Sequence, residues 1–291
     1  MQTTTTMMMM MMNGEKQQKF QQQQQQQEEE VGGMAMVEQV MCLYEKICEL
    51  ESLEPCEAVN SLFSQLVDLC IRPCHIDVEA MEVGEEEMAA KRSHLIHLCA
   101  IAEGLLESHY AKLLAAMEKP LENLHVFPYY SNYRDLAAME YEMLRKAQAQ
   151  MDMDMDMDME RVAFVGSGPL PMTSLVLATY HMKRARFDNY DIDPRANDIA
   201  ARLSSSLTGA RMAFHTCDIR HVREELADYR VLFLAALVGV DAPTKADILA
   251  HLARFMHPRA TLVVRSAHGS RAFLYPAVPV PMLESAGFHV L

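Results

Sequence analysis

Residues 161–171 read RVAFVGSGPLP, and residues 187–194, further along the chain, read FDNYDIDP. Four apolar residues, 162–165, predict a buried strand, and Gly166 and Gly168 allow a tight backbone turn that can approach a ligand closely. A helix over about 171–183 and a second strand follow, and that strand leads into Asp191 and Asp193. A carboxylate there is placed to accept hydrogen bonds from ribose hydroxyls. The alternative is an ordinary strand-turn-helix with acidic surface residues.

The turn departs from the dinucleotide fingerprint, because GSGPLP has a proline where a third glycine would open the helix. This disfavours a pyrophosphate cradle. A short G-x-G turn is typical of S-adenosylmethionine-binding folds, whose ligand carries a sulfonium and an amino-acid tail and no phosphate. After the third predicted strand, Asp218 can accept the exocyclic amine of an adenine, with a helix N-cap as the alternative role.

Strand and helix patterns alternate from residue 161 onward, which is typical of a parallel sheet with crossover connections. Helices are predicted over 197–207, 222–228 and 242–256. The predicted strands are AFVG, FDNYDI, ARMAFHTCD, YRVLFLAALVG, ATLVVRSAHG and, at the end, FHVL. We therefore expect an α/β fold for residues 161–291.

Residues 34–150 have helical periodicity and predict a separate helical bundle domain, with helices over 56–70, 88–117 and 132–150. Residues 1–33 combine methionine, glutamine and glutamate runs and predict a disordered tail. Residues 151–160, MDMDMDMDME, predict a low-complexity linker. Together these tracts hold 12 of the 25 methionines, so the methionine excess does not indicate a metal site.

Composition bounds the possible partners. The formal net charge of −14 depends on three acidic runs and would be −3 without their eleven acids; with no basic stripe, nucleic-acid binding is disfavoured. No apolar run is long enough to span a bilayer. Seven scattered cysteines fit reduced thiols in a cytoplasmic protein, and Cys70 and Cys74 lack a second pair at ligand spacing, so no metal site is expected.

Several segments together resemble plant nicotianamine synthases, from about residue 37 to the end of the chain. The combination of VGSGPLP, FPYYSNY and RSAHGSR is more specific than any general methyltransferase pattern. The other matching segments are SHLIHLCAIAEGLLESHY, FDNYDIDP, ANDIAARL, FHTCDI, VLFLAALVG and LVVRSAHGSRAFLYP.

The resemblance implies a helical domain over a class I methyltransferase-like (Rossmann-like) domain. It also implies an aminocarboxypropyl transferase that condenses three S-adenosylmethionine molecules into nicotianamine, a metal chelator, and releases three methylthioadenosines. S-adenosylmethionine is then the substrate, and no other cofactor is expected. The alternatives are an ordinary S-adenosylmethionine-dependent methyltransferase and a catalytically impaired relative that still binds S-adenosylmethionine. A homo-oligomer is compatible with each.

Glu103 and Glu107 lie one helical turn apart in an apolar helix, where unpaired carboxylates are costly. By resemblance, one of them, with Glu107 favoured, deprotonates the attacking amine, and Tyr133 or Tyr129 orients it. The alternative is that both glutamates are surface residues or pair with Lys112, Arg92 or His94.

The resemblance places the remaining site residues in the sheet domain. Arg265 or Arg271 is expected to clamp a substrate carboxylate, and His268 is a candidate proton carrier with an equally good structural role. The residues expected to bind S-adenosylmethionine are Gly166, Ser167, Gly168, Asp191, Asp193, Asp218 and Leu237.

Two departures from the family carry expectations. The family normally continues past Leu291, so we expect the last strand or strands of the sheet to be missing and the stability reduced. The acidic repeat at 151–160 stands where the family has a short basic linker. A flexible tether there is expected to permit folding.

Overall fold

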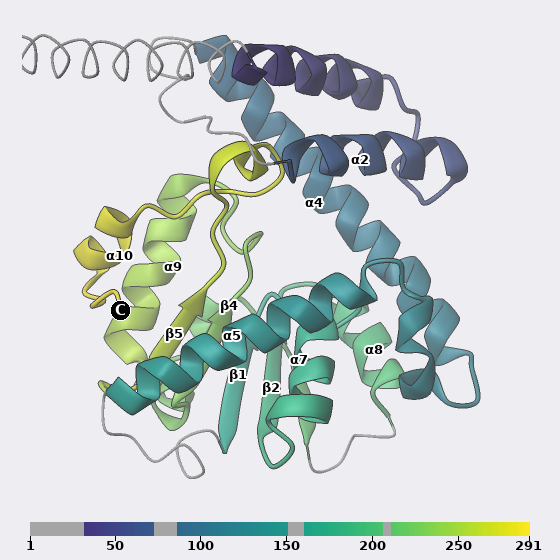
Figure 1. The fold of residues 1–291 in the computed structure, drawn as a ribbon. Helices are drawn as coiled ribbons and strands as arrows, with labels where there is room; N and C mark the ends of the chain where they lie inside the picture. Colours follow the sequence, from purple (N-terminus) through teal and green to yellow (C-terminus); the bar gives the residue numbers. More distant parts are fainter. Residues whose placement is uncertain (1–31, 73–85, 151–159, 206–210) are drawn as a thin grey trace, which may run out of the picture.

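The computed structural model describes residues 32–72, 86–150, 160–205 and 211–291 (Figure 1). All of the predicted linker except Glu160 and nearly all of the predicted disordered tail, together with Cys74, lie outside the described residues. Residues 32 and 33 already belong to a helix that runs over 32–48. The helical segments of the first half lie above and across a sheet built by the second half.

Five parallel strands form one sheet in the order β3-β2-β1-β4-β5, which confirms the predicted α/β class. Because the strand order reverses between β1 and β4, the crevice at the carboxyl ends of these strands is where such sheets bind ligands. The strands are β1 (Arg161–Val165), β2 (Arg186–Asp191), β3 (Met212–Thr216), β4 (Val231–Leu234) and β5 (Thr261–Val264). The connecting helices are α7 (Met172–Val176), continued by the π-helical turn η2 (Leu177–His181), α8 (Pro194–Leu203), α9 (Ala242–Phe255) and α10 (Val280–Ala286).

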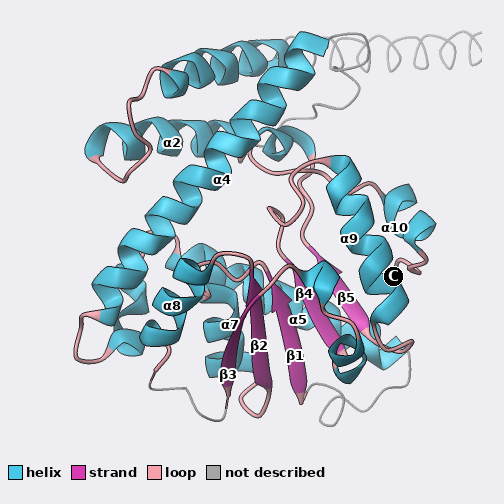
Figure 2. Cartoon of the chain, turned by 180° about the vertical axis from the view of Figure 1, so that it is seen from behind, coloured by secondary structure: helices cyan, strands magenta, loops and turns pink. Residues whose placement is uncertain are grey.

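Alternate residues of each strand enter two different cores, because successive strand side chains point to opposite faces of a sheet. Val162 and Phe164 pack with α7, whereas Ala163 and Val165 pack with α9. Both faces of the sheet are therefore covered. Figure 2 shows the sheet from the side of α9, with α5 and α7 behind the strands.

The helical half consists of the helix over 32–48, α2 (Glu57–Cys70), α4 (Glu86–Ala115), the short 3-10 helix η1 (Pro120–Val126) and α5 (Tyr130–Gln150). The long helix α4 joins two hydrophobic cores. Its first half contributes Leu95 and Cys99 to a core shared with α2, and its last turns contribute Ala111 and Leu114 to the core beneath the sheet. The middle of α4 consequently lies between the two cores.

Helix α5 belongs to the sheet layer as much as to the helical half. Its residues Ala137 and Leu144 are buried in the same core as Val162 and Phe164 of β1, and Figure 1 shows α5 lying across the strands. The predicted division at residue 150 therefore separates segments that pack together.

The structure corrects the predicted final strand. Residues 288–291 form no strand, because α10 ends at Gly287 in a left-handed conformation with φ 104°. The backbone N–H of Phe288 donates to the carbonyl of Leu283 and closes that helix end. Val290 and Leu291 are exposed. In the described residues, β5 therefore has β4 as its only strand neighbour.

Two further predicted elements differ in extent. The segment predicted as one strand up to residue 239 ends as β4 at Leu234, and Val238 then donates its N–H to the carbonyl of Ala235 in a tight turn. The helix predicted over 222–228 is a short 3-10 helix, η4 (Glu224–Asp228). Residues 235–240 are only half-buried, so hydrophobicity did not distinguish a buried strand from a turn that packs beside the sheet.

Lys245 in the first turn of α9 is 2% exposed, and its ammonium donates to the carbonyl of Ala236 at 2.9 Å. Burial lowers its pKa from 10.5 to about 8. The folded protein therefore binds fewer protons than the unfolded chain between pH 8 and 10.5, so its stability rises with pH in that window.

We expect Lys245→Met to remove this pH dependence. In urea denaturation at pH 7 to 10, wild type should gain up to about 1.4 kcal/mol per pH unit relative to the variant above pH 8. The exposed control Lys119→Met should keep the wild-type slope, since Lys119 pairs only with exposed Glu122. The prediction would be contradicted if the free energy of unfolding changed with pH in the same way for wild type and for Lys245→Met.

Candidate active site

Glu103 and Glu107 project from the middle of α4, between the two cores, and each accepts a hydrogen bond from a tyrosine. Tyr133 of α5 donates to Glu107 Oε1 at 3.1 Å, and Tyr275 donates to Glu103 Oε2 at 3.0 Å. Glu107 is 8% exposed. The predicted alternative, in which both glutamates pair with Lys112, Arg92 or His94, is therefore not what the structure shows.

The electrostatics of the two glutamates are unusual for surface acids. Burial raises the pKa of Glu107 well above its ordinary value, and the neighbouring charge of Glu103 raises it further. Burial also raises the pKa of Glu103, while Tyr275 and Arg265 oppose that rise. Each carboxyl can therefore exchange a proton nearer to neutral pH than an exposed glutamate can, which suits general acid–base chemistry.

The glycine turn after β1 lies directly against Glu107. The N–H of Gly168 donates to Asp191 Oδ2 at 2.8 Å, and the N–H of Gly166 donates to the carbonyl of Tyr190 at 2.8 Å. Gly168 has φ 64°, and a Cβ built on it would lie 2.7 Å from Glu107 Oε2. Glycine is thus favoured here by the backbone conformation, and a Cβ would also force the carboxylate of Glu107 to move.

The three predicted acids at the strand ends have different surroundings. Asp191 ends β2, and besides binding Gly168 it accepts the N–H of Asp193. Asp193 is the N-cap of α8 and accepts from Arg195. Asp218 caps the 3-10 helix η3 (Ile219–His221), and both its oxygens contact Arg220, which is the N-cap alternative of the sequence analysis. Its contact with an adenine stays a prediction.

Arg265 follows β5 and forms a buried ion pair. Its guanidinium binds Glu140 of α5 through two hydrogen bonds of 2.7 and 3.0 Å, and it also donates to Thr173 at 2.7 Å. The guanidinium lies 5.5 Å from the ring centre of Phe164. The edge of the Arg265 guanidinium that was expected to bind a substrate carboxylate thus binds the carboxylate of Glu140. The positive charge of Arg265 nevertheless lowers the pKa of both Glu103 and Glu107.

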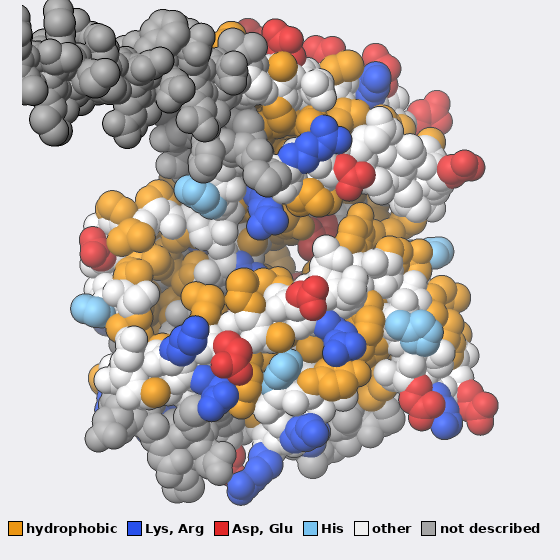
Figure 3. Space-filling view, in the orientation of Figure 1, with side chains coloured by type: hydrophobic (Ala, Val, Ile, Leu, Met, Phe, Trp, Pro, Cys, Tyr) orange, Lys and Arg blue, Asp and Glu red, His pale blue; other side chains and the backbone are white. Residues whose placement is uncertain are grey.

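The space-filling view shows this face of the molecule hollowed between the helical half and the sheet half, with basic and acidic side chains inside (Figure 3). Segments far apart in the chain therefore meet in one place: α4 supplies the glutamates, α5 supplies Tyr133, the turn after β1 supplies the glycines, and the segment after β5 supplies Arg265 and Tyr275.

Comparison with known proteins assigns the chain to a family. The family described as nicotianamine synthase protein matches residues 27–291. This chain belongs to the nicotianamine synthase family. It is 49% identical to a nicotianamine synthase of Solanum lycopersicum over 258 residues, which cover 88% of this chain and 78% of that protein. It is also 49% identical to nicotianamine synthase 9 of Hordeum vulgare over 259 residues, 88% of this chain and 74% of that protein.

Solved structures support the fold. The chain superposes on a crystal structure of MtNAS in complex with MTA and tNA with a TM-score of 0.65 and 20% sequence identity, over 84% of this chain and 88% of that one. A crystal structure of a mutant of MtNAS in complex with S-adenosylmethionine gives a TM-score of 0.63 at 20% identity over the same shares. The predicted fold of this nicotianamine synthase family member is thereby confirmed.

Five predicted residues make no side-chain hydrogen bond, within the described part of the chain, to Glu103, Glu107, Tyr133 or Tyr275, the four side chains of the Glu–Tyr cluster. His268 and Arg271 are both exposed. His268 directly precedes the 3-10 helix η5 (Gly269–Phe273), and Arg271 lies within it. Tyr129 is half-buried with its ring edge against Phe127. Leu237 lies half-buried in the turn after β4, whose Val238 packs against Gly166. Ser167 between the two glycines is 6% exposed, and its hydroxyl has no hydrogen-bond partner among the described residues.

The sequence analysis missed Tyr275 and Glu140. Tyr275 lies in the quoted segment RAFLYP, but only the fold brings it to Glu103, 172 positions away. Glu140 is 4% exposed within the helix α5, and an acid on the apolar face of an amphipathic helix is a signal that could have indicated a buried partner.

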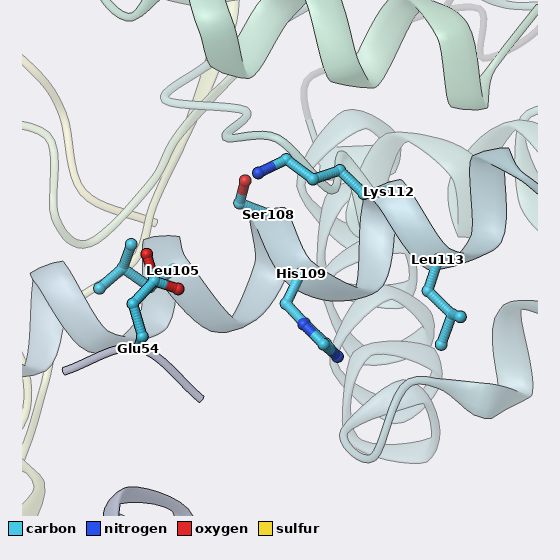
Figure 4. A pocket seen from close by; sticks show the side chains of 6 residues that line it. All are labelled: Glu54, Leu105, Ser108, His109, Lys112 and Leu113. Atoms are coloured by element: carbon cyan, nitrogen blue, oxygen red, sulfur yellow. The ribbon is translucent and has the colours of Figure 1, made fainter. Parts of the chain in front are cut away.

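Two hollows in the described part of the chain lie outside the Glu–Tyr cluster. One, of about 350 Å³, is on the outer face of α4, where Lys112 points toward Ser108 (Figure 4). Another, of about 330 Å³, is lined by Tyr190, His215 and Tyr229 on the α9 side of the sheet. Among the described residues, no cluster of three or more His, Cys, Asp or Glu side chains suits a metal ion, and no helix is both long and apolar enough to cross a membrane.

Proposed function

We propose that this chain is a nicotianamine synthase that condenses three S-adenosylmethionine molecules into nicotianamine and releases three methylthioadenosines. The observation that carries the proposal is the Glu107–Tyr133 pair held against the Gly168 turn. A proton acceptor and a turn suited to the amino-acid tail of S-adenosylmethionine are thereby adjacent. The family membership gives the reaction, and the geometry supports the roles of the residues.

In the proposed reaction, Glu107 accepts a proton from the α-ammonium of the acceptor, and Tyr133 orients the carboxylate. The nitrogen lone pair then attacks the carbon of the aminocarboxypropyl chain that is bonded to sulfur. The carbon–sulfur bond breaks, and its electrons stay on sulfur as the neutral thioether of methylthioadenosine. Since the sulfonium activates all three of its carbon neighbours, the placement of the amine selects the group that is transferred.

The substrate-binding roles are assigned by the same reasoning. Asp191, at the end of β2, is proposed to bind the ribose hydroxyls, while Gly166, Ser167 and Gly168 approach the tail. A cationic ammonium beside Glu107 and Glu103 favours their ionised forms, because an opposite charge lowers a carboxyl pKa. Binding of the substrate thus prepares the base.

We further propose that the protein acts in the cytoplasm on small molecules. The six cysteines among the described residues are all free, which suits a reducing compartment.

The test is incubation of the purified chain with S-adenosylmethionine alone, followed by mass spectrometry. A synthase should release methylthioadenosine and nicotianamine in a ratio of three to one without any added acceptor. S-adenosylhomocysteine that forms only with an added acceptor would instead indicate a methyltransferase. Binding of S-adenosylmethionine without turnover would indicate an impaired relative.

A further inference from the structure

Four side chains at the site alternate between carboxyl and phenol. Tyr133 donates to Glu107 at 3.1 Å, and a hydrogen-bonding interaction of Tyr133 with Glu103 also opposes the burial that raises the pKa of Glu103. Tyr275 donates to Glu103 at 3.0 Å. The two hydrogen-bonded pairs, Glu107 with Tyr133 and Glu103 with Tyr275, lie next to each other because the two glutamates are one helical turn apart on α4, and Tyr133 influences both glutamates.

Three further titratable side chains among the described residues influence this array. Arg265 faces it from the end of β5, and Cys99 on α4 and Asp191 on β2 are the other two. The carboxyl of Glu103 and the phenol of Tyr275 lie deep in the protein, but both residues keep more exposed surface than Glu107, which is 8% exposed. The side of the array toward Tyr275 is therefore the candidate exit for a proton taken up by Glu107.

The proposed reaction makes such a route useful. Three condensations release three protons for each product molecule, but a single carboxylate can hold one proton at a time. Glu107 must therefore lose its proton before it can act as a base again.

We propose that Glu107, Tyr133, Glu103 and Tyr275 form a proton relay that discharges the base between successive condensations. The proton of Glu107 passes to the oxygen of Tyr133 while the hydroxyl proton of Tyr133 passes to the carboxylate of Glu103, so Tyr133 is unchanged. Glu103 then releases its proton through the hydroxyl of Tyr275 to water. The relay rests on the proposed synthase function. Glu103 and Tyr275 do not touch the reacting atoms in it and act only through Glu107, as positioning residues.

The experiment is rapid-quench measurement of methylthioadenosine with S-adenosylmethionine in excess over the full-length enzyme. The wild-type enzyme should release three equivalents of methylthioadenosine per active site without a pause. Glu103→Gln removes the second proton acceptor. We therefore expect one equivalent of methylthioadenosine per enzyme to be released rapidly, followed by steady turnover that is at least ~10-fold slower. Tyr275→Phe keeps both Glu107 and Glu103 as proton acceptors but removes the exit to water. It should therefore release two equivalents of methylthioadenosine rapidly before the same slow phase. Partially condensed product should accumulate in both variants.

The matched control is Tyr229→Phe, which deletes another buried tyrosine hydroxyl that bonds to Tyr190 at 2.8 Å on the opposite face of the sheet. It should release methylthioadenosine as wild type does. Circular dichroism establishes that each variant is folded. Uniform slowing of every phase in Glu103→Gln and Tyr275→Phe, or wild-type kinetics in both, would overturn the relay. A wild-type enzyme that releases no methylthioadenosine would instead refute the synthase proposal itself.

Discussion

Glu107→Gln is expected to reduce the release of methylthioadenosine by about 10²–10⁴-fold, the range that general acid–base catalysis contributes. Glutamine matches the shape of glutamate, and its amide oxygen can still accept the hydrogen bond of Tyr133. It cannot take a proton from an ammonium group. The measurement is steady-state turnover with S-adenosylmethionine alone, combined with calorimetric titration of the same ligand, whose affinity should change only a few-fold.

The control is Glu122→Gln. Glu122 is exposed in η1 and forms a surface ion pair with Lys119 at 3.0 Å. Its variant should turn over at the wild-type rate. Unchanged turnover in Glu107→Gln would remove this residue from the role of base and leave Glu103 as the candidate.

The glycine turn could be predicted from sequence because its determinants are local. Gly166 and Gly168 have φ of 80° and 64°, a conformation that glycine alone adopts readily, and the short apolar strand before them is nearly continuous in hydrophobicity. The same local logic predicted the N-cap alternative for Asp218, which the structure shows.

The position of the glutamates was predicted only in part. Their spacing placed Glu103 and Glu107 on one face of a helix, but no periodicity states which way that face points. Its direction is set by the ends of α4, where Leu95 and Leu114 are each fully buried in a different core. The orientation is thus a tertiary property.

Long-range pairs were beyond sequence reasoning. Arg265 and Glu140 are 125 positions apart, and Arg265 was assigned to substrate because nothing local indicated its partner. A buried cluster around Asp188 was also missed: this carboxylate is 1% exposed inside β2, bonded to Arg161 and His215, and these bonds outweigh burial and lower its pKa to about 2. An acid in the middle of a strand predicted to lie inside the sheet, between Phe187 and Asn189, was the available signal.

Glu140→Leu is expected to lower the free energy of unfolding by about 3–5 kcal/mol, because it leaves the guanidinium of Arg265 buried without its partner. Glu140 is 4% exposed, and the pair has bidentate geometry. A guanidinium keeps its proton even when it is buried, so the arginine cannot relieve the imbalance by becoming neutral. Urea denaturation at pH 7 measures the change.

The double variant Glu140→Leu/Arg265→Met tests the cause of this loss. If the cost comes from an unpaired buried charge, removing both charges should recover most of the stability, since replacing a whole buried ion pair with apolar residues is often neutral. The control Glu142→Leu breaks the exposed pair with Arg145 on the same helix and should cost no more than about 1 kcal/mol. Additive losses in the double variant would show that the two side chains stabilise the protein independently. Turnover of the stable double variant should still be low, because the positive charge that favours ionised Glu103 and Glu107 is gone.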